Sequence, residues 1–163
     1  MLKVKLAVVS LGIAMMLPLS SALFAQDANI APAAPLPSQI LTAKKVFIAN
    51  IGEKYSTGVW SGGPERMYNE FYAAIRSCGC YELVAAPADS DLVMEVKVNS
   101  NTVDWQLELV LLDPKTQIPL WAIYEPIQVS GTQKTRDKNF NGTIEKLVGD
   151  LKALSSQPTG SRK

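Results

Sequence analysis

The chain has 163 residues, of which 47% are hydrophobic and 19% are charged, a composition typical of a globular domain. Its formal net charge is +1 and no Lys/Arg cluster lies within the predicted domain, which argues against binding to nucleic acid. It contains no histidine, which excludes Ser-His-Asp and Cys-His catalysis and the usual zinc and iron sites, so we expect no metal and no cofactor.

The first 25 residues predict a secretory signal peptide. Lys3 and Lys5 give a short basic start, residues 6–19 form an apolar run, and an A-x-A-like cleavage site ends at Ala25. The alternative is a retained anchor, but the run is shorter than the roughly 20 residues that a membrane-spanning helix needs. No cysteine follows the cleavage site, where a bacterial lipoprotein would carry one. We therefore expect a periplasmic or secreted protein with no stable membrane anchor after cleavage.

Three further segments are expected after the signal peptide. Residues 26–43 are rich in Pro and Ala, which favours an extended, polyproline-like linker, the alternative being a disordered terminus with no role. Residues 44–154 are expected to form a single domain, and residues 155–163 a polar tail.

The domain begins with a predicted strand, helix and strand. Residues 45–50 are short and rich in β-forming residues, which favours a strand. After a polar, glycine-containing loop, Pro64 suits a helix start, and apolar residues spaced four, four and three apart between Met67 and Cys78 predict one buried helical stripe. Gly79 ends this helix, and residues 81–85 are expected to form the second strand.

Three longer strands are expected next. Residues 92–99 and 105–112 alternate between apolar and polar side chains, which predicts a sheet with one buried and one solvent-exposed face. A hairpin turn with proline at its preferred position leads to a strand over residues 118–124. Pro119 cannot donate to a ladder, so this strand is expected at an edge, with residues 127–129 extending it.

The last predicted element is a helix with six apolar residues in a stripe between Phe140 and Leu154, capped by Asn139 or Asn141. Residues 125–138 before it are expected to be irregular. The order is β-α-β-β-β-β-α, which predicts an α/β (α+β) fold: a two-layer sandwich with a mixed, mostly antiparallel sheet and two helices on one face. Residues 45–85 provide the one expected parallel connection.

Three segments resemble a broad family of small bacterial envelope modules. Residues 88–96 carry an A-D-x-x-L/V turn that opens a strand, residues 107–121 carry a D-x-x-T/S-g-x-x-L-W hairpin, and a helix follows. The family includes the amino-terminal domain of TolB, the LpoB-type activators of peptidoglycan synthesis and the CsgG-like secretion proteins. Trp121 stands where the returning strand needs an aromatic cross-strand partner. Gln117 replaces the family's glycine, and the lipobox cysteine is missing. The resemblance implies a fold and an envelope setting, not one shared function.

Cys78 and Cys80 are the sharpest local feature, because only Gly79 separates them. In an oxidising compartment this spacing predicts a structural disulfide or two buried thiols. A redox or metal role is the alternative, and Arg76 is the one cation close in sequence that would favour a thiolate.

Two surfaces are candidates for partner binding. Tyr55 and Trp60 lie in a glycine-containing loop and are expected to be exposed contacts, the alternative being a cap over the core. Trp121 and Tyr124 belong to the edge region of residues 118–129, which is suited to strand addition.

The sequence therefore predicts a non-enzymatic module that binds an envelope protein or a cell-wall component. The alternative is a thiol-disulfide redox protein that uses Cys78 and Cys80. A carboxylate enzyme is a third hypothesis, for which the sequence offers no acid pair.

Overall fold

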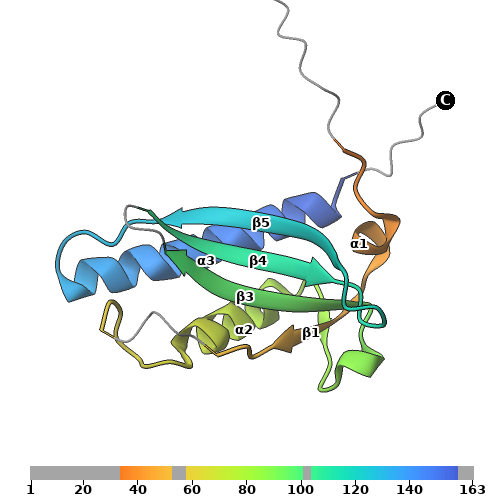
Figure 1. Ribbon diagram of the computed structural model, residues 1–163, viewed down its shortest axis with the longest axis horizontal. Helices are drawn as coiled ribbons and strands as arrows, with labels where there is room; N and C mark the ends of the chain where they lie inside the picture. Colours follow the sequence, from red (N-terminus) through yellow and green to blue (C-terminus); the bar gives the residue numbers. More distant parts are fainter. Residues whose placement is uncertain (1–33, 53–57, 101–103, 158–163) are drawn as a thin grey trace, which may run out of the picture. The chain divides into compact units, whose positions relative to one another are not determined.

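The computed structural model describes residues 34–52, 58–100 and 104–157, so the predicted signal peptide and Tyr55 lie outside the described residues. These residues form a five-stranded sheet with the strand order β2-β1-β3-β4-β5, and α2 and α3 lie behind it (Figure 1). The elements are α1 (Ser38–Thr42), β1 (Lys45–Ala49), α2 (Arg66–Cys78), β2 (Glu82–Leu83), the short 3₁₀ helix η1 (Pro87–Asp89), β3 (Leu92–Ser100), β4 (Trp105–Leu112), β5 (Pro119–Ile127) and α3 (Gln133–Ser155).

The sheet is mixed, as predicted. The long strands β3, β4 and β5 pair antiparallel, whereas β1 pairs parallel with β2 on one side and with β3 on the other. The expected two-layer α+β sandwich is confirmed, with a second parallel pair, β1 with β3, besides the predicted one. This second pair arises because the chain returns through η1 to the free side of β1.

The core lies between the helices and the inner face of the sheet. Alternation along each strand turns every second side chain towards the helices, where it meets their apolar stripes. The largest fully buried side chains of this layer are Val46, Leu92, Met94, Leu107, Leu109 and Leu111 from the sheet, Phe71 and Ile75 from α2, and Phe140, Leu147 and Leu151 from α3.

The last helix starts earlier than predicted, at Gln133, so Asn139 and Asn141 lie inside it and do not cap it. Thr132 is the cap, because its hydroxyl accepts a hydrogen bond from the Thr135 backbone N–H. The first two turns carry no apolar stripe. Long-range hydrogen bonds hold them instead, including one of 2.9 Å from Arg136 Nε to the Val59 carbonyl.

The amino-terminal end of the folded part also differs from the expectation. Residues 38–43 were expected in an extended linker, but Ser38–Thr42 form a helical turn, and Ile40 within it is fully buried. The Gln39 side chain donates a 2.9 Å hydrogen bond to the Asp91 carbonyl, which fixes α1 on the domain.

Among the described residues, none of the helices combines the length and hydropathy needed to cross a lipid bilayer.

Candidate functional site: the open sheet face and its edge

The outer face of the sheet, opposite the helices, has no described element over it (Figure 1). Strand register arranges its side chains in rows that cross β3, β4 and β5. One row, here called the charged row, contains Lys97, Glu108 and Tyr124. The neighbouring row, here called the small row, contains Glu95, Val110 and Ala122.

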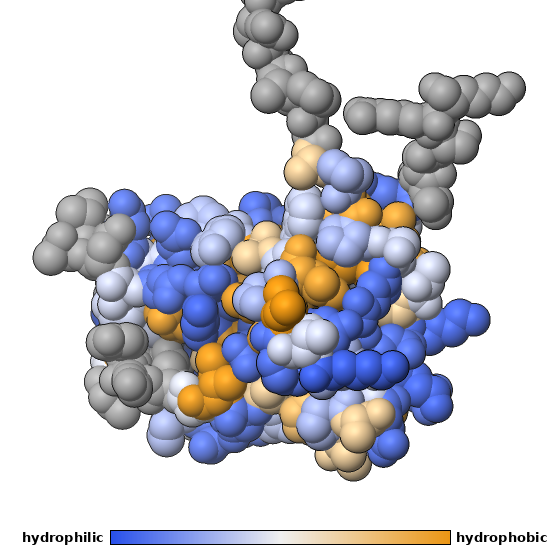
Figure 2. Space-filling view, turned by 45° about the vertical axis from the view of Figure 1, so that its right-hand side comes forward, coloured by the Kyte–Doolittle hydropathy of each residue, from blue (hydrophilic) through white to orange (hydrophobic). Residues whose placement is uncertain are grey.

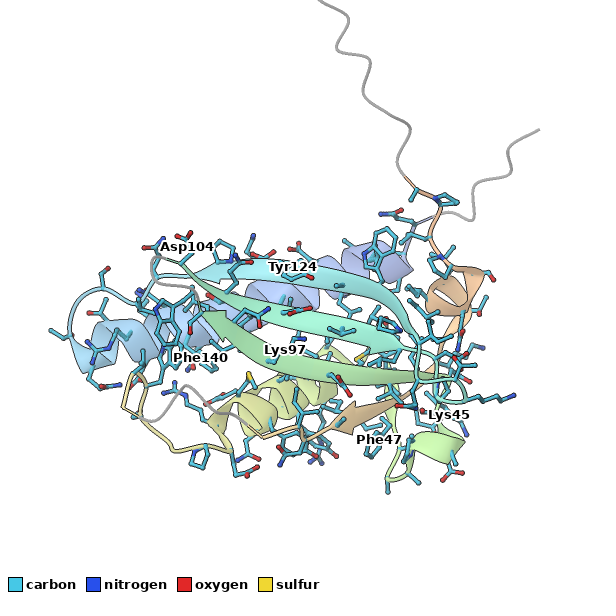
Figure 3. All side chains as sticks on the ribbon, viewed as in Figure 1. Lys45, Phe47, Lys97, Asp104, Tyr124 and Phe140 are labelled. Atoms are coloured by element: carbon cyan, nitrogen blue, oxygen red, sulfur yellow. A yellow bond between two sulfur atoms is a disulfide. The ribbon has the colours of Figure 1, made fainter. Side chains whose placement is uncertain are left out.

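The charged row is a connected set of polar groups. Lys97 Nζ lies 3.3 Å from Glu108 Oε2, and the Tyr124 hydroxyl donates a 3.1 Å hydrogen bond to Glu108 Oε1. The side-chain amide of Asn99 also donates to Glu108. The hydrogen bond to Glu108 and the charge of this carboxylate raise the pKa of Tyr124. Figure 3 shows Lys97 and Tyr124 on this open face, on β3 and β5.

The small row differs from the charged row, because it has one charged residue, Glu95, at one end, followed by two small apolar residues. Glu95 is half-buried, and no ion pair or hydrogen bond joins its side chain to any other described residue. Val110 and Ala122 lie between Glu95 and the sheet edge. Both rows line a shallow depression of about 420 Å³. An apolar floor with charged groups beside it is suited to a side chain that is apolar along its stem and charged at its tip.

The free edge of β5 borders this depression. Pro126 has no N–H, so its nitrogen must face away from β4, which makes its pair with Gln106 a non-hydrogen-bonded one. The backbone N–H and C=O groups of successive strand residues point alternately towards and away from the neighbouring strand. Tyr124 and Ala122, two and four residues before Pro126, therefore also present their N–H and C=O groups outward. In the described part of the chain, no hydrogen bond joins this outer edge of β5 to another segment. The edge thus offers unpaired donors and acceptors for a further strand.

Two of the predicted contact residues, Trp121 and Tyr124, line this depression, and Tyr124 is 52% exposed. Ile118, in the preceding turn, is more exposed still, at 59%. In the turned view of Figure 2, hydrophobic residues appear in several small patches among hydrophilic ones. Trp121 pairs with Leu111 on the inner face, and its half-buried side chain packs against the core.

Trp60 is not an exposed contact, so that expectation is wrong. It is only 5% exposed, and its ring lies 5.4 Å from that of Trp105 and 5.0 Å from that of Phe140. The alternative interpretation, a cap over the core, is correct for this residue. The glycine-rich neighbourhood suggested exposure, whereas contacts with residues far along the chain decide the burial.

The described end of the same loop is fixed to α3. Asp137 accepts hydrogen bonds from the Ser61 backbone N–H at 2.9 Å and from Arg66 Nη1 at 2.6 Å. The hydrogen bonds from Ser61 come first among the causes that hold the pKa of Asp137 well below its usual range, and Arg66 adds to them. Arg66 also donates to Asn141 at 2.8 Å. These contacts anchor residues 58–66 and leave the sheet edge as the better candidate surface.

Cys78 and Cys80 are paired with each other in the structure. Cys78 is the last residue of α2, and Gly79 takes the left-handed conformation that lets the chain turn between the two cysteines. The carbonyl end of a helix carries partial negative charge, which disfavours a thiolate, whereas reactive thiols favour the opposite end. This position supports a structural role that ties the end of α2 to the chain leading into β2.

Glu125 is an unforeseen feature of the inner face. It is 4% exposed between β5 and α3, where Lys146 donates a hydrogen bond to it. Burial raises the pKa of Glu125, a hydrogen bond with Asp150 raises it further, and Lys146 opposes both. The alternation of residues 121–127 could have placed it on the inner face, but that stretch was expected to turn irregular at residue 125.

The described residues bring no group of three or more Cys, Asp or Glu side chains into an arrangement that could hold a metal ion.

No protein-family model and no curated protein matches the chain. Among solved structures it is similar to the PelC dodecamer of Paraburkholderia phytofirmans, with 13% identity, 74% of this chain and 94% of that chain covered, and a TM-score of 0.48. It is also similar to a DUF330 protein of Xanthomonas campestris, with 15% identity, 76% and 87% coverage and a TM-score of 0.41. A third is the uncharacterized lipoprotein B of Nitrosomonas europaea, with 9% identity, 77% and 92% coverage and a TM-score of 0.38. At these values the likenesses transfer neither a function nor an assembly to this chain.

Proposed function

We propose that this chain is a non-enzymatic binding module of the bacterial cell envelope that holds an extended segment of another envelope protein along the free edge of β5. The observation that carries the proposal is the run of unpaired backbone groups at Ala122 and Tyr124, between Pro119 and Pro126. The export signal expected at the amino terminus supports the periplasmic setting.

Strand addition suits this edge for two reasons. Main-chain hydrogen bonds give affinity for an extended segment, while the neighbouring depression gives its alternate side chains a place to bind. The two prolines limit the stretch that can pair, which protects a long edge strand against open-ended association. The result is a short, bounded docking edge.

The same face offers little to an enzyme. Glu108 is its most buried carboxylate, at 8% exposure, but Lys97, Asn99 and Tyr124 already donate to it or pair with it. The oxygens of this carboxylate are already occupied by these three donors, which leaves little access for a substrate proton.

Ala122→Pro tests the proposal, since it removes an N–H that points away from β4. The protein is purified from the periplasm of an expressing bacterium, and binders are selected from a random-peptide display library. We expect selected peptides to bind Ala122→Pro at least about tenfold more weakly than the unmodified protein. This loss is consistent with a missing main-chain hydrogen bond and a disturbed strand geometry beside it. Ala122→Ser keeps the N–H and is the matched control, expected to bind within about twofold.

Circular dichroism and thermal unfolding establish that Ala122→Pro is folded. A second measurement does not depend on this variant: bound peptide should slow hydrogen exchange at the Ala122 and Tyr124 amides of the unmodified protein. Peptides that bind the Pro variant as tightly as the unmodified protein, or that leave both amides unprotected, would overturn strand addition at β5.

A further inference from the structure

We propose that the bound segment presents an arginine or lysine side chain opposite Ala122, which lies across the small row towards Glu95. This inference rests on the proposed strand addition at β5 and names the chemistry of the partner.

The charge balance of the outer face is the first argument. Lys97 is engaged with Glu108, at 3.3 Å, and Glu108 also accepts from Asn99 and Tyr124. Glu95 lines the same depression, half-buried, without a cation of its own among the described residues. The two carboxylates therefore face a single ammonium group, and the remaining charge favours a cation from outside.

The shape of the small row is the second argument. Ala122 and Val110 leave a low path between the β5 edge and Glu95, bordered on one side by the Tyr124 side chain of the charged row. The methylene stem of arginine or lysine can lie over these two apolar side chains, while its head remains polar. The Tyr124 ring beside the path adds a surface on which a guanidinium group stacks favourably.

Register and length give the third argument. A residue of an added strand that lies opposite Ala122 points its side chain to the same face as Ala122. Strands lie roughly 4.8 Å apart, so such a residue stands three strand spacings from Glu95. Only the longest side chains, arginine before lysine, extend far enough to approach the Glu95 carboxylate. A short or acidic residue would leave Glu95 unpaired or repel it.

The test selects peptides from the same display library in parallel against the unmodified protein, Glu95→Gln and Glu95→Lys. We expect arginine and lysine to be enriched at one position of the peptides selected on the unmodified protein, absent from that position with Glu95→Gln, and replaced by aspartate or glutamate with Glu95→Lys. Thermal unfolding of the variants checks that Glu95 affects the peptide rather than the fold.

A double-mutant cycle then measures the pair itself. Replacing the basic residue of a selected peptide by methionine should weaken binding to the unmodified protein about three- to fivefold, the size of a partly exposed ion pair. The same replacement should weaken binding to Glu95→Gln by a smaller factor, because only the contact with the Tyr124 ring is then lost. Ala122→Leu blocks the path while keeping the backbone N–H, and should weaken the basic peptide more than the methionine peptide.

The outcomes separate this inference from the proposed function. If peptides are sensitive to Ala122→Pro but the methionine replacement weakens binding equally with and without Glu95, the basic side chain binds elsewhere and the inference is wrong, while strand addition stands. If no selected peptide is sensitive to Ala122→Pro, both fall together.

Discussion

The two faces of the sheet are built from the same strands but by opposite means. On the inner face, Leu107, Leu109 and Leu111 are fully buried beneath α2 and α3. On the outer face, Glu108 and Val110 stand between them along the same strand and meet charged, small or aromatic neighbours across the sheet. The inner face derives its stability from extensive apolar burial, whereas the outer face combines a small buried apolar cluster, Val93, Val110 and Leu112, with polar groups held in fixed positions. This difference makes the outer face the side that can recognise a partner with little loss of stability.

The largest effect expected from this comparison is on the inner face. Leu109→Ala should lower the free energy of unfolding by about 3–5 kcal/mol, because a fully buried side chain leaves a cavity under the helices. Val110→Ala, one residue along, should lower it by about 1 kcal/mol. Urea unfolding followed by circular dichroism measures both.

Val96→Ala provides a matched control, since it deletes the same atoms as Val110→Ala from the inner face, where Val96 is 1% exposed. It should be the more destabilising of the two valine variants. Equal losses would mean that the outer face is packed as tightly as the inner one, and the distinction between the faces would fail.

Much of this contrast was predictable from the sequence. Alternation over residues 92–99 and 105–112 assigned Glu95, Lys97 and Glu108 to the outer face, and that assignment is confirmed. What alternation cannot supply is register, which decides that Glu108 faces Tyr124 while Glu95 faces Val110. Register depends on the exact pairing across two turns, so the rows of the candidate site emerge only in three dimensions.

The features that the sequence missed share one cause, which is stabilisation by distant contacts rather than by local pattern. Gln133–Lys138 carry no apolar stripe, yet they are helical because Arg136 and Asp137 bind residues near Trp60. The five-residue helix α1 contributes a single buried side chain, that of Ile40, which gives no periodicity to detect. Trp60 lies in a loop-like sequence and is nevertheless part of the core.

A smaller, pH-dependent effect is expected from Glu125, the one charged side chain in the described strands that alternation turns into the inner face. Its pKa is raised in the folded protein, chiefly by burial. A raised carboxyl pKa stabilises the folded state below the ordinary value for glutamate, about 4.3, and this contribution is lost as the pH rises through the raised value. The unmodified protein should therefore lose stability relative to Glu125→Gln as the pH rises from acid towards neutrality.

Urea unfolding at a series of pH values measures this difference. Glu145→Gln, which removes an exposed carboxylate from the same helix as Lys146, is the control for the loss of one negative charge. If the free energy of unfolding of the unmodified protein instead rises relative to that of Glu125→Gln with increasing pH, the pairing of Glu125 with Lys146 outweighs its burial. The inner face would then tolerate a charge more readily than its apolar packing suggests.

The smallest effect is expected on the outer face, where Tyr124 reports on the charged row. Its pKa is raised first by its hydrogen bond to Glu108 and then by the charge of that carboxylate, while Lys97 opposes the shift. Glu108→Gln should therefore lower the pKa of Tyr124, and Lys97→Gln should raise it further. The ultraviolet absorbance of tyrosinate measures this pKa, with the Tyr124→Phe titration subtracted to isolate the Tyr124 ring.

Two substitutions that shift the pKa of Tyr124 in opposite directions require Lys97, Glu108 and Tyr124 to be in electrostatic contact. If both variants shift the pKa of Tyr124 in the same direction, or neither shifts it, the charged row is not connected in solution. The outer face would then lack the fixed polar groups that distinguish it from the inner face.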